Sequence, residues 1–195
     1  MLQEFVDQVN KTAQKTIEGM HTALPGEITA FDPASGMASV QPKAKFKKPN
    51  GETMDFPAVT GVPVVFPQSA NVTIAWPIKP GDGCLLVFSE LALDYWMYGK
   101  ETDTVLKFDL SSAIAIPNLY AKGSAVMQTA CSENAAVIVA GDTTLKVAPG
   151  GVTVVGKLTV EGEIVAAGDV KANKSISLAT HTHGGDSGGS TTPPR

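Results

Sequence analysis

Two of the three histidines in this 195-residue sequence, His181 and His183, lie two residues apart near its C-terminal end. Neutral imidazole nitrogens bind zinc, iron, copper and nickel, so this pair is a candidate set of metal ligands. The pair alone is a weak signal, because a mononuclear enzyme site needs further ligands and a solvated tail accounts for the pair equally well. The third histidine, His21, lies near the other end of the chain, where we expect it to be exposed or packed.

A short apolar stretch, Ser175–Leu178, precedes the histidines and is the element that would position them. Residues two apart on a strand point to the same side, so the two imidazoles are expected to share a face. A continuous strand would put that face opposite the apolar one, so the prediction requires a bulge or a bend after Leu178. The glycine-rich residues 184–189 come next, and we expect them to fold back around the site because glycine accepts tight turns.

Residues 123–178 carry a quasi-repetitive pattern of short strands. Turns rich in Gly, Asp and Asn separate pairs of aliphatic residues that lie two apart, namely Val137/Val139, Leu145/Val147, Val152/Val154, Leu158/Val160 and Ile176/Leu178. Such strands in a single chain bury too little apolar area to offset the entropy of ordering them. Three chains wound together would turn these side chains toward a shared axis and pair the strand edges. We therefore expect an intertwined trimeric β-helix here, with a monomeric sandwich or solenoid as the alternative.

Threefold symmetry would change the chemistry of the histidine pair. Three chains would bring six imidazole nitrogens to one point, within the terminal segment 179–195. Six ligands suit an octahedral first-row metal such as Fe(II), with Ni(II) or Co(II) as alternatives, whereas zinc prefers four ligands. Such a site would have no open position for water or substrate, so its metal would be structural and would clamp the chain ends. For this reason we expect no enzymatic activity.

The N-terminal part of the chain carries strand signals of a different kind. Turns rich in Pro, Gly, Asp and Asn separate five to six predicted strands, including Glu27–Phe31, Met37–Phe46, Val62–Phe66, Val72–Trp76 and Cys84–Phe88. This spacing is typical of a small closed barrel of the OB type, which we predict over residues 24–100. A short helix at Leu91–Tyr98 would end this domain, and residues 101–122 would form a connector. Cys84 lies in an apolar run and is expected to be buried.

Residues 1–23 predict an N-terminal helix. Apolar side chains recur at steps of three and four residues from Leu2 to Met20, which is a helical stripe, and Pro25 and Gly26 end it. A stripe this narrow must be covered by something. The chain's own barrel, a hub protein and the sister helices of other copies are the alternatives.

Composition excludes several classes of protein. Charged residues make up only 17% of the chain, which contains 19 Gly and 13 Pro, so short strands and turns are favoured over a helical bundle. Two cysteines without metal-site spacing make neither a disulfide framework nor a zinc site. The sequence shows no secretory signal and no apolar run near the roughly 18 residues of a spanning helix. We expect assembly in the cytoplasm of a host cell.

Nucleic acid is not an expected partner. The net charge of −4 gives no general attraction to a phosphate backbone. One basic segment remains, in which Lys43, Lys45, Lys47 and Lys48 flank Phe46, as an OB-fold nucleic-acid binder would require. A solvated loop or a protein-docking surface is the favoured interpretation of this segment.

From about Leu24 onward, the sequence resembles the central spike, or membrane-piercing needle, proteins of contractile-tailed phages and related bacteriocin particles. The segments that carry the resemblance are Pro25–Ile28, Val62–Pro67, Trp76–Asp82, Leu86–Glu90 and Thr180–Gly184 followed by a Gly/Ser/Thr run. The order of these segments is more specific than any one of them. The resemblance implies an OB-fold collar, a trimeric β-helix shaft, and one iron ion per trimer held by His181 and His183 of three chains.

The same resemblance implies a mechanical role. The collar would attach to the baseplate hub of the tail, and the tip would pierce the bacterial outer membrane when the sheath contracts. The protein would then belong to the tail baseplate of a virion or to a bacteriocin particle. The alternative is a trimeric receptor- or glycan-binding tail protein. All aromatic residues precede the predicted shaft, however, so its distal end lacks the side chains that sugars stack on.

Overall fold

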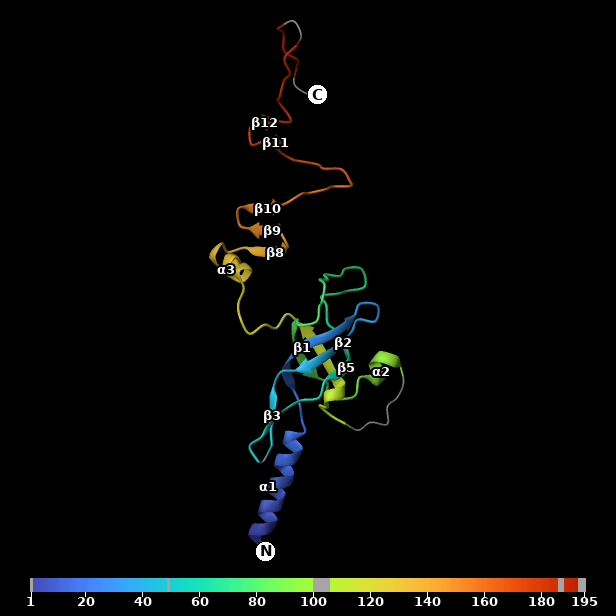
Figure 1. Ribbon diagram of the computed structural model, residues 1–195. Coiled ribbons are helices and arrows are strands. Elements are labelled where there is room, and N and C mark those ends of the chain that lie inside the picture. Colours follow the sequence, from blue (N-terminus) through green and yellow to red (C-terminus); the bar gives the residue numbers. More distant parts are fainter. Residues whose placement is uncertain (1, 49, 100–105, 186–187, 193–195) are drawn as a thin grey trace. The chain divides into compact units, whose positions relative to one another are not determined.

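The computed structural model describes residues 2–48, 50–99, 106–185 and 188–192 (Figure 1). The chain divides into two compact units, Met1–Gly123 and Ser124–Arg195. Strands are the commonest regular elements in both units, and a helix begins the chain, so the predicted all-β class is confirmed. Within the described residues, no helix combines the length and apolar character needed to cross a membrane.

The N-terminal helix predicted from the apolar stripe is confirmed as α1, Leu2–Glu18. None of its residues is buried. The chain leaves the helix through a turn, in which the Met20 amide donates to the Ile17 carbonyl at 3.0 Å. The first strand begins shortly after, at Ala23.

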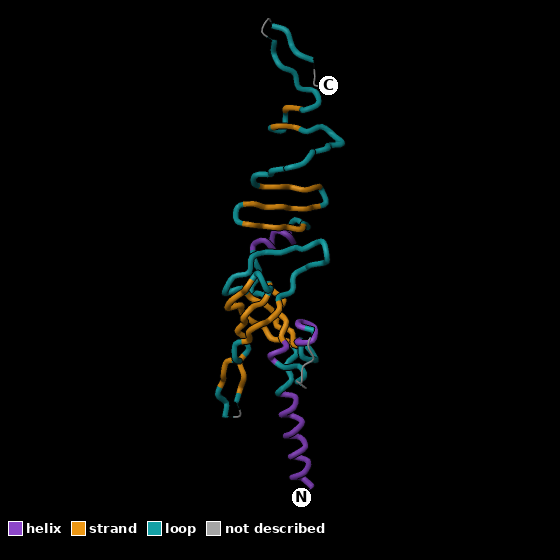
Figure 2. Tube along the Cα trace, turned by 90° about the vertical axis from the view of Figure 1, so that its right-hand side faces the viewer, coloured by secondary structure: helices purple, strands orange, loops and turns teal. Residues whose placement is uncertain are grey.

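Five strands of the first unit form one antiparallel sheet in the order β5-β2-β1-β6-β7. Their bounds are β1 Ala23–Asp32, β2 Met37–Pro42, β5 Val59–Pro63, β6 Gly83–Phe88 and β7 Ala113–Pro117. The sheet curls, and its two edges meet at a parallel bridge between Val64 and Ala115, where the Val65 amide donates to the Ala115 carbonyl at 2.9 Å. Figure 2 shows this curled sheet. A five-stranded, partly open barrel of this strand order has OB topology.

The interior of the barrel is filled by side chains that alternate along its strands. In β2 and β6 every second side chain is buried, and in β1 the bulge between Ile28 and Ala30 re-aims the chain. The core consists of Ile28, Ala38, Val40, Val59, Val62, Cys84, Leu86, Phe88, Ala113 and Ala115. Cys84 is fully buried, as expected. Gly26 lies where a Cβ atom would meet Val40 Cγ1 at 2.6 Å, so only glycine fits at this crossing of strands.

The fifth barrel strand lies in the stretch that we expected to be a connector. Residues 113–117 pair along the whole of β6 as β7, so the barrel sheet continues well past residue 100. The opposite correction applies to Val72–Trp76, which was predicted as a strand and is not one. Prolines flank this segment at 67 and 77, and it makes only an isolated bridge between Gln68 and Thr73.

The first unit also contains smaller elements outside the five-stranded sheet. The predicted strand Met37–Phe46 is divided into β2 and β3, Lys45–Lys47, and β3 pairs with β4, Thr53–Asp55, as a hairpin. The short helix expected after the barrel is α2, Asp94–Tyr98. A 3₁₀ turn, Leu110–Ser112, leads into β7, and Asp109 caps it by accepting a hydrogen bond from the Ser111 amide at 2.9 Å.

The second unit begins with a helix that sequence patterns missed, α3, Ala125–Ser132. Its signal was Ser124, whose hydroxyl caps the helix by accepting from the Met127 amide at 3.2 Å. An antiparallel three-stranded sheet follows, made of β8 Ala136–Ala140, β9 Thr143–Ala148 and β10 Gly151–Val155. Each strand contains one predicted aliphatic pair. The register puts Val137/Val139 on the face opposite to Leu145/Val147 and Val152/Val154, so the expectation that these pairs all turn the same way is wrong for the first pair.

The remaining pairs behave differently. Leu158 and Val160 were expected on a strand, and the structure has none there. Further along, β11 Lys171–Ala172 pairs with β12 Ile176–Ser177. No described residue of 124–195 is buried.

Candidate metal centre

A turn carries the chain from β12 to the histidines. β12 ends at Ser177, residues 178–180 form the turn, and the His181 amide donates to the Ser177 carbonyl at 3.1 Å. This turn does what a bulge or bend was expected to do. It resets the direction of the side chains, so the alternation of β12 no longer dictates where the imidazoles point.

Backbone carbonyls hold the ring of His181. Its Nδ1 lies 2.9 Å from the Ser177 oxygen and 3.2 Å from the Leu178 oxygen. A carbonyl oxygen only accepts hydrogen bonds, so this geometry assigns the proton to Nδ1 and leaves the lone pair of Nε2 free. Metal-binding histidines have this arrangement, in which the second nitrogen donates to a carbonyl and fixes the ring.

The structure brings the two predicted ligands together. The ring centres of His181 and His183 lie 5.1 Å apart and the rings are nearly perpendicular, at 84°. Two imidazoles at neighbouring positions of an octahedral metal, with bonds of about 2.1 Å, have ring centres roughly 4.5 Å apart. The separation of the two rings is therefore close to the value that two ligands of one ion would have.

A small hairpin anchors the second histidine. The His183 amide donates to Thr191 Oγ1 at 2.9 Å, and the Thr191 amide returns a bond to the His183 carbonyl, also at 2.9 Å. Gly184 and Ser190 bridge in antiparallel fashion. Gly188 has a positive φ of 79°, which suits glycine at the fold-back. The described residues on the two sides of this fold-back thus pair with each other beside His183.

One chain does not complete a metal site here. In the described part of the chain, no group of three His, Cys, Asp or Glu side chains could hold an ion. Two imidazoles alone leave two positions of a four-coordinate metal or four positions of a six-coordinate metal open. Further ligands would have to come from outside the described part of this chain.

His21, the remaining histidine, is packed rather than available as a ligand. Its ring makes an edge contact with Phe56, with ring centres 5.5 Å apart, and lies 5.7 Å from the ring of Phe88. Both partners are residues of the first unit, so this imidazole belongs to the edge of the barrel.

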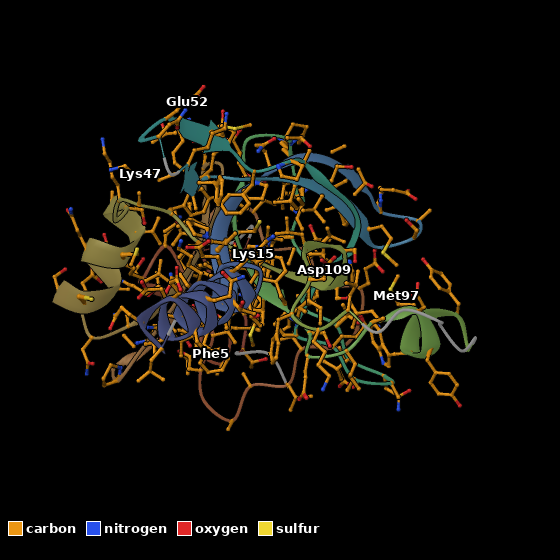
Figure 3. The ribbon with its side chains drawn as sticks, turned by 90° about the horizontal axis from the view of Figure 1, so that it is seen from below. Phe5, Lys15, Lys47, Glu52, Met97 and Asp109 are labelled. Atoms are coloured by element: carbon orange, nitrogen blue, oxygen red, sulfur yellow. The ribbon has the colours of Figure 1, made fainter. Side chains whose placement is uncertain are left out.

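In the basic segment around Phe46, most of the lysine side chains are paired with carboxylates. Lys45 pairs with Asp55 at 2.5 Å and Lys48 with Glu52 at 3.0 Å, while Lys43 pairs with Glu27 at 3.0 Å. Figure 3 labels Lys47 and Glu52. Lysines paired with carboxylates are poor partners for phosphates, so the nucleic-acid interpretation loses its main support.

The sheet β8–β10 has one strongly apolar face. The strand register puts alternate residues of all three strands on this face, namely Ile138, Leu145, Val147, Val152 and Val154. Ile138 is 65% exposed and Val152 is 64% exposed. The other face is mixed: it carries Lys146, which is ion-paired with Glu133, beside Val137, Val139 and Val155. We call the five aliphatic residues the shaft face.

Two models of known protein families match this chain, one in each unit. Residues 24–118 match the phage protein Gp138 N-terminal domain, and this range includes all five barrel strands. Residues 175–195 match the GpV apex motif, which contains both histidines. No curated protein matches the chain.

Proposed function

Because the chain belongs to the phage spike proteins, we propose that it forms a homotrimeric spike at the distal end of a contractile tail and pierces the bacterial outer membrane when the sheath contracts. Its role in the tail is structural, and it is associated with the virion. The single observation that carries the trimer is the shaft face, which is fully apolar and uncovered.

The shaft face supports three copies around one axis. Five aliphatic side chains on a sheet with no second layer would cost free energy if water reached them in the assembled protein. A threefold arrangement would bury the same residues of each chain against one another. The edges of β8 and β10 would also gain strand partners, which would remove two rows of unpaired backbone groups.

The apex supports a metal clamp. Three copies of His181 and His183 would supply six nitrogens, and we propose that they hold one iron ion per trimer. A filled octahedral ion stabilises the three chain ends that bind it. The carbonyls of Ser177 and Leu178 would hold each His181 ring for this task. We propose no turnover at this site, since the matched families are structural phage tail proteins.

The barrel would serve as the collar that joins the spike to the baseplate hub. Helix α2 exposes Tyr95, Trp96 and Tyr98, and Trp96 is 72% exposed. Aromatic residues of this kind contribute most of the binding energy in protein interfaces. The second unit, residues 124–195, contains no Phe, Trp or Tyr, which argues against a sugar-binding tip.

The decisive experiment compares the double variant His181→Ala/His183→Ala with Thr182→Ala. For the wild type we expect a native mass of three chains and about one iron ion per three chains by elemental analysis. The double variant is expected to keep the trimeric mass and lose the iron, because the shaft face lies upstream of the apex. Thr182→Ala, which changes the residue between the ligands, should keep both.

The same variants test piercing in assembled particles. Particles with the double variant should still contract but release less dye from outer-membrane vesicles, since the chain ends of the tip are no longer clamped. Thr182→Ala particles should match the wild type. A monomeric native mass, or one iron ion in each monomer, would overturn the proposal. Equal dye release from particles that lack residues 179–195 would overturn the role in piercing.

A further inference from the structure

Helix α1 has an apolar face that no described part of the chain covers. Leu2 is 80% exposed and Phe5 is 67% exposed, and none of the helix residues is buried. Figure 3 shows the side chains of this helix, with Phe5 and Lys15 labelled. On a helix with about 100° between residues, the apolar side chains occupy an arc of about 120°. Such a continuous face requires a partner.

The spacing of this face follows a heptad repeat. Within α1, Val6 and Ala13 lie seven residues apart, and so do Leu2, Val9 and Thr16; Met20, in the turn after the helix, continues the first series. The two series alternate at steps of four and three, which are the a and d positions of a coiled coil. Phe5 and Ile17 widen the seam at its sides.

The charged residues lie on the opposite side of the helix. They occupy only the outer positions b, c and f, and they are Glu4, Asp7, Lys11, Lys15 and Glu18. The flanking e and g positions carry no charge in this helix. Three identical helices could therefore pack in parallel without bringing like charges together along the seam.

We propose that α1 pairs with α1 of two other copies of this chain to form a parallel three-stranded coiled coil. β-branched residues at both a and d positions, here Val6 and Val9, favour more than two strands. Apolar residues at e and g, here Ile17 and Phe5, suit three helices, which bury these flanks more than two helices do. The inference rests on the proposed homotrimer and adds to it a second contact between the copies, at the start of the chain.

The other possible partners fit less well. A membrane surface attracts helices with a basic polar face, and α1 has three acidic and two basic residues. A groove on a hub protein accepts an apolar stripe at the same spacing, and such a partner would leave the seam thiols of the disulfide experiment below unlinked. The chain's own barrel leaves every residue of α1 unburied.

The trimer would also explain how so short a helix stays folded. Isolated helices shorter than about 12–15 residues are marginal in water even when they are rich in alanine. Helix α1, with 17 residues that include several β-branched residues and no alanine beyond Ala13, is only slightly longer. Copies tethered through the shaft meet at a high effective concentration, so a modest seam is enough to hold them together. We expect the helix to lose order whenever the shaft is dissociated.

A disulfide experiment tests this seam. In the Cys131→Ser background, which removes the exposed native thiol, Val9→Cys puts a thiol at a d position and Lys11→Cys puts one on the charged side. On mild oxidation, Val9→Cys should give linked chain pairs in more than half of the trimers, because two of three seam thiols can meet. Lys11→Cys should stay at least tenfold less linked.

Native mass, measured on the same samples, separates this inference from the proposed function. A trimeric Val9→Cys protein that stays unlinked would overturn the coiled coil and leave the trimeric spike intact. A monomeric mass would overturn both. Linked Val9→Cys in a dimeric species would overturn the three-stranded arrangement. Circular dichroism gives an independent readout of helix content. We expect Val9→Glu to lose the helical signal of α1 and Lys11→Glu to keep it.

Discussion

The barrel and the sheet β8–β10 share a local sequence pattern, but only the barrel buries its apolar side chains. Both consist of short antiparallel strands in which apolar residues alternate along the chain. The barrel has five strands and closes where Val64 meets Ala115, so one side chain in two faces an enclosed core. The second sheet has three strands, and its apolar face stays exposed. Closure, rather than alternation, decides whether a single chain can bury its own apolar side chains.

The largest effect is expected in the second sheet, for which we propose that other copies of the chain cover the shaft face. Val154→Asp would put a carboxylate on the shaft face, and a trimer would bury three of them around one axis. Burying unpaired charges costs several kcal/mol each, so we expect the trimer to be lost. Thr153→Asp, on the other face of the same strand, should remain trimeric. Sedimentation measures the difference, and a trimeric Val154→Asp protein would mean that this face is not the interface.

An intermediate effect is expected in the barrel, which depends on its own core. Leu86 is fully buried, so Leu86→Ala should lower the free energy of unfolding by about 2–5 kcal/mol. Ile116 lies on the neighbouring strand and is 43% exposed, so Ile116→Ala should cost less than about 1 kcal/mol. Urea unfolding followed by tryptophan fluorescence reports on the barrel, because Trp76 and Trp96 both belong to the first unit. Similar losses in both variants would contradict a core that is closed within one chain.

The smallest effect distinguishes the two cysteines, one in each unit. Cys84 is buried in the barrel and Cys131 is exposed. Burial raises the pKa of the Cys84 thiol from 9.0 to about 11. A thiol reagent at pH 8 should therefore modify Cys131 roughly tenfold faster or more, since the thiolate is the reactive form. Comparable rates would mean that the barrel opens as readily as the second unit.

The Cys84 thiol also predicts how the stability of the barrel depends on pH. The pKa is higher in the folded barrel than in the unfolded chain, so the neutral thiol contributes stability that is fully present below about pH 9. This contribution is lost as the pH rises from about 9 to about 11. The urea midpoint of the wild type should fall more steeply over that range than the midpoint of Cys84→Ala.

Periodicity alone predicted α1, most of the barrel strands and the three strands of the second sheet. It failed at β7 and at Val72–Trp76, for opposite reasons. Residues 113–117 are short and follow an irregular stretch, so only pairing with β6 identifies them as a strand. Val72–Trp76 has the alternation of a strand but no neighbouring strand to pair with. Strand pairing is a long-range property, which a local pattern does not contain.

The candidate site was predicted in part. His181 and His183 were identifiable because few side chains bind metals, and a pair two residues apart is recognisable in any fold. Their orientation was not, because strand alternation pointed the rings to the wrong side. The turn at 178–180 and the bonds from His181 Nδ1 to the carbonyls of Ser177 and Leu178 decide it.

The sequence by itself determined which elements form and which residues could bind a metal, because propensity, alternation and ligand chemistry are properties of neighbouring residues. Tertiary structure decided which of these elements share a core, since burial depends on what lies across a sheet. It also decided that the two imidazoles lie side by side and that the shaft face stays uncovered within one chain. We propose that other copies of the chain complete both features.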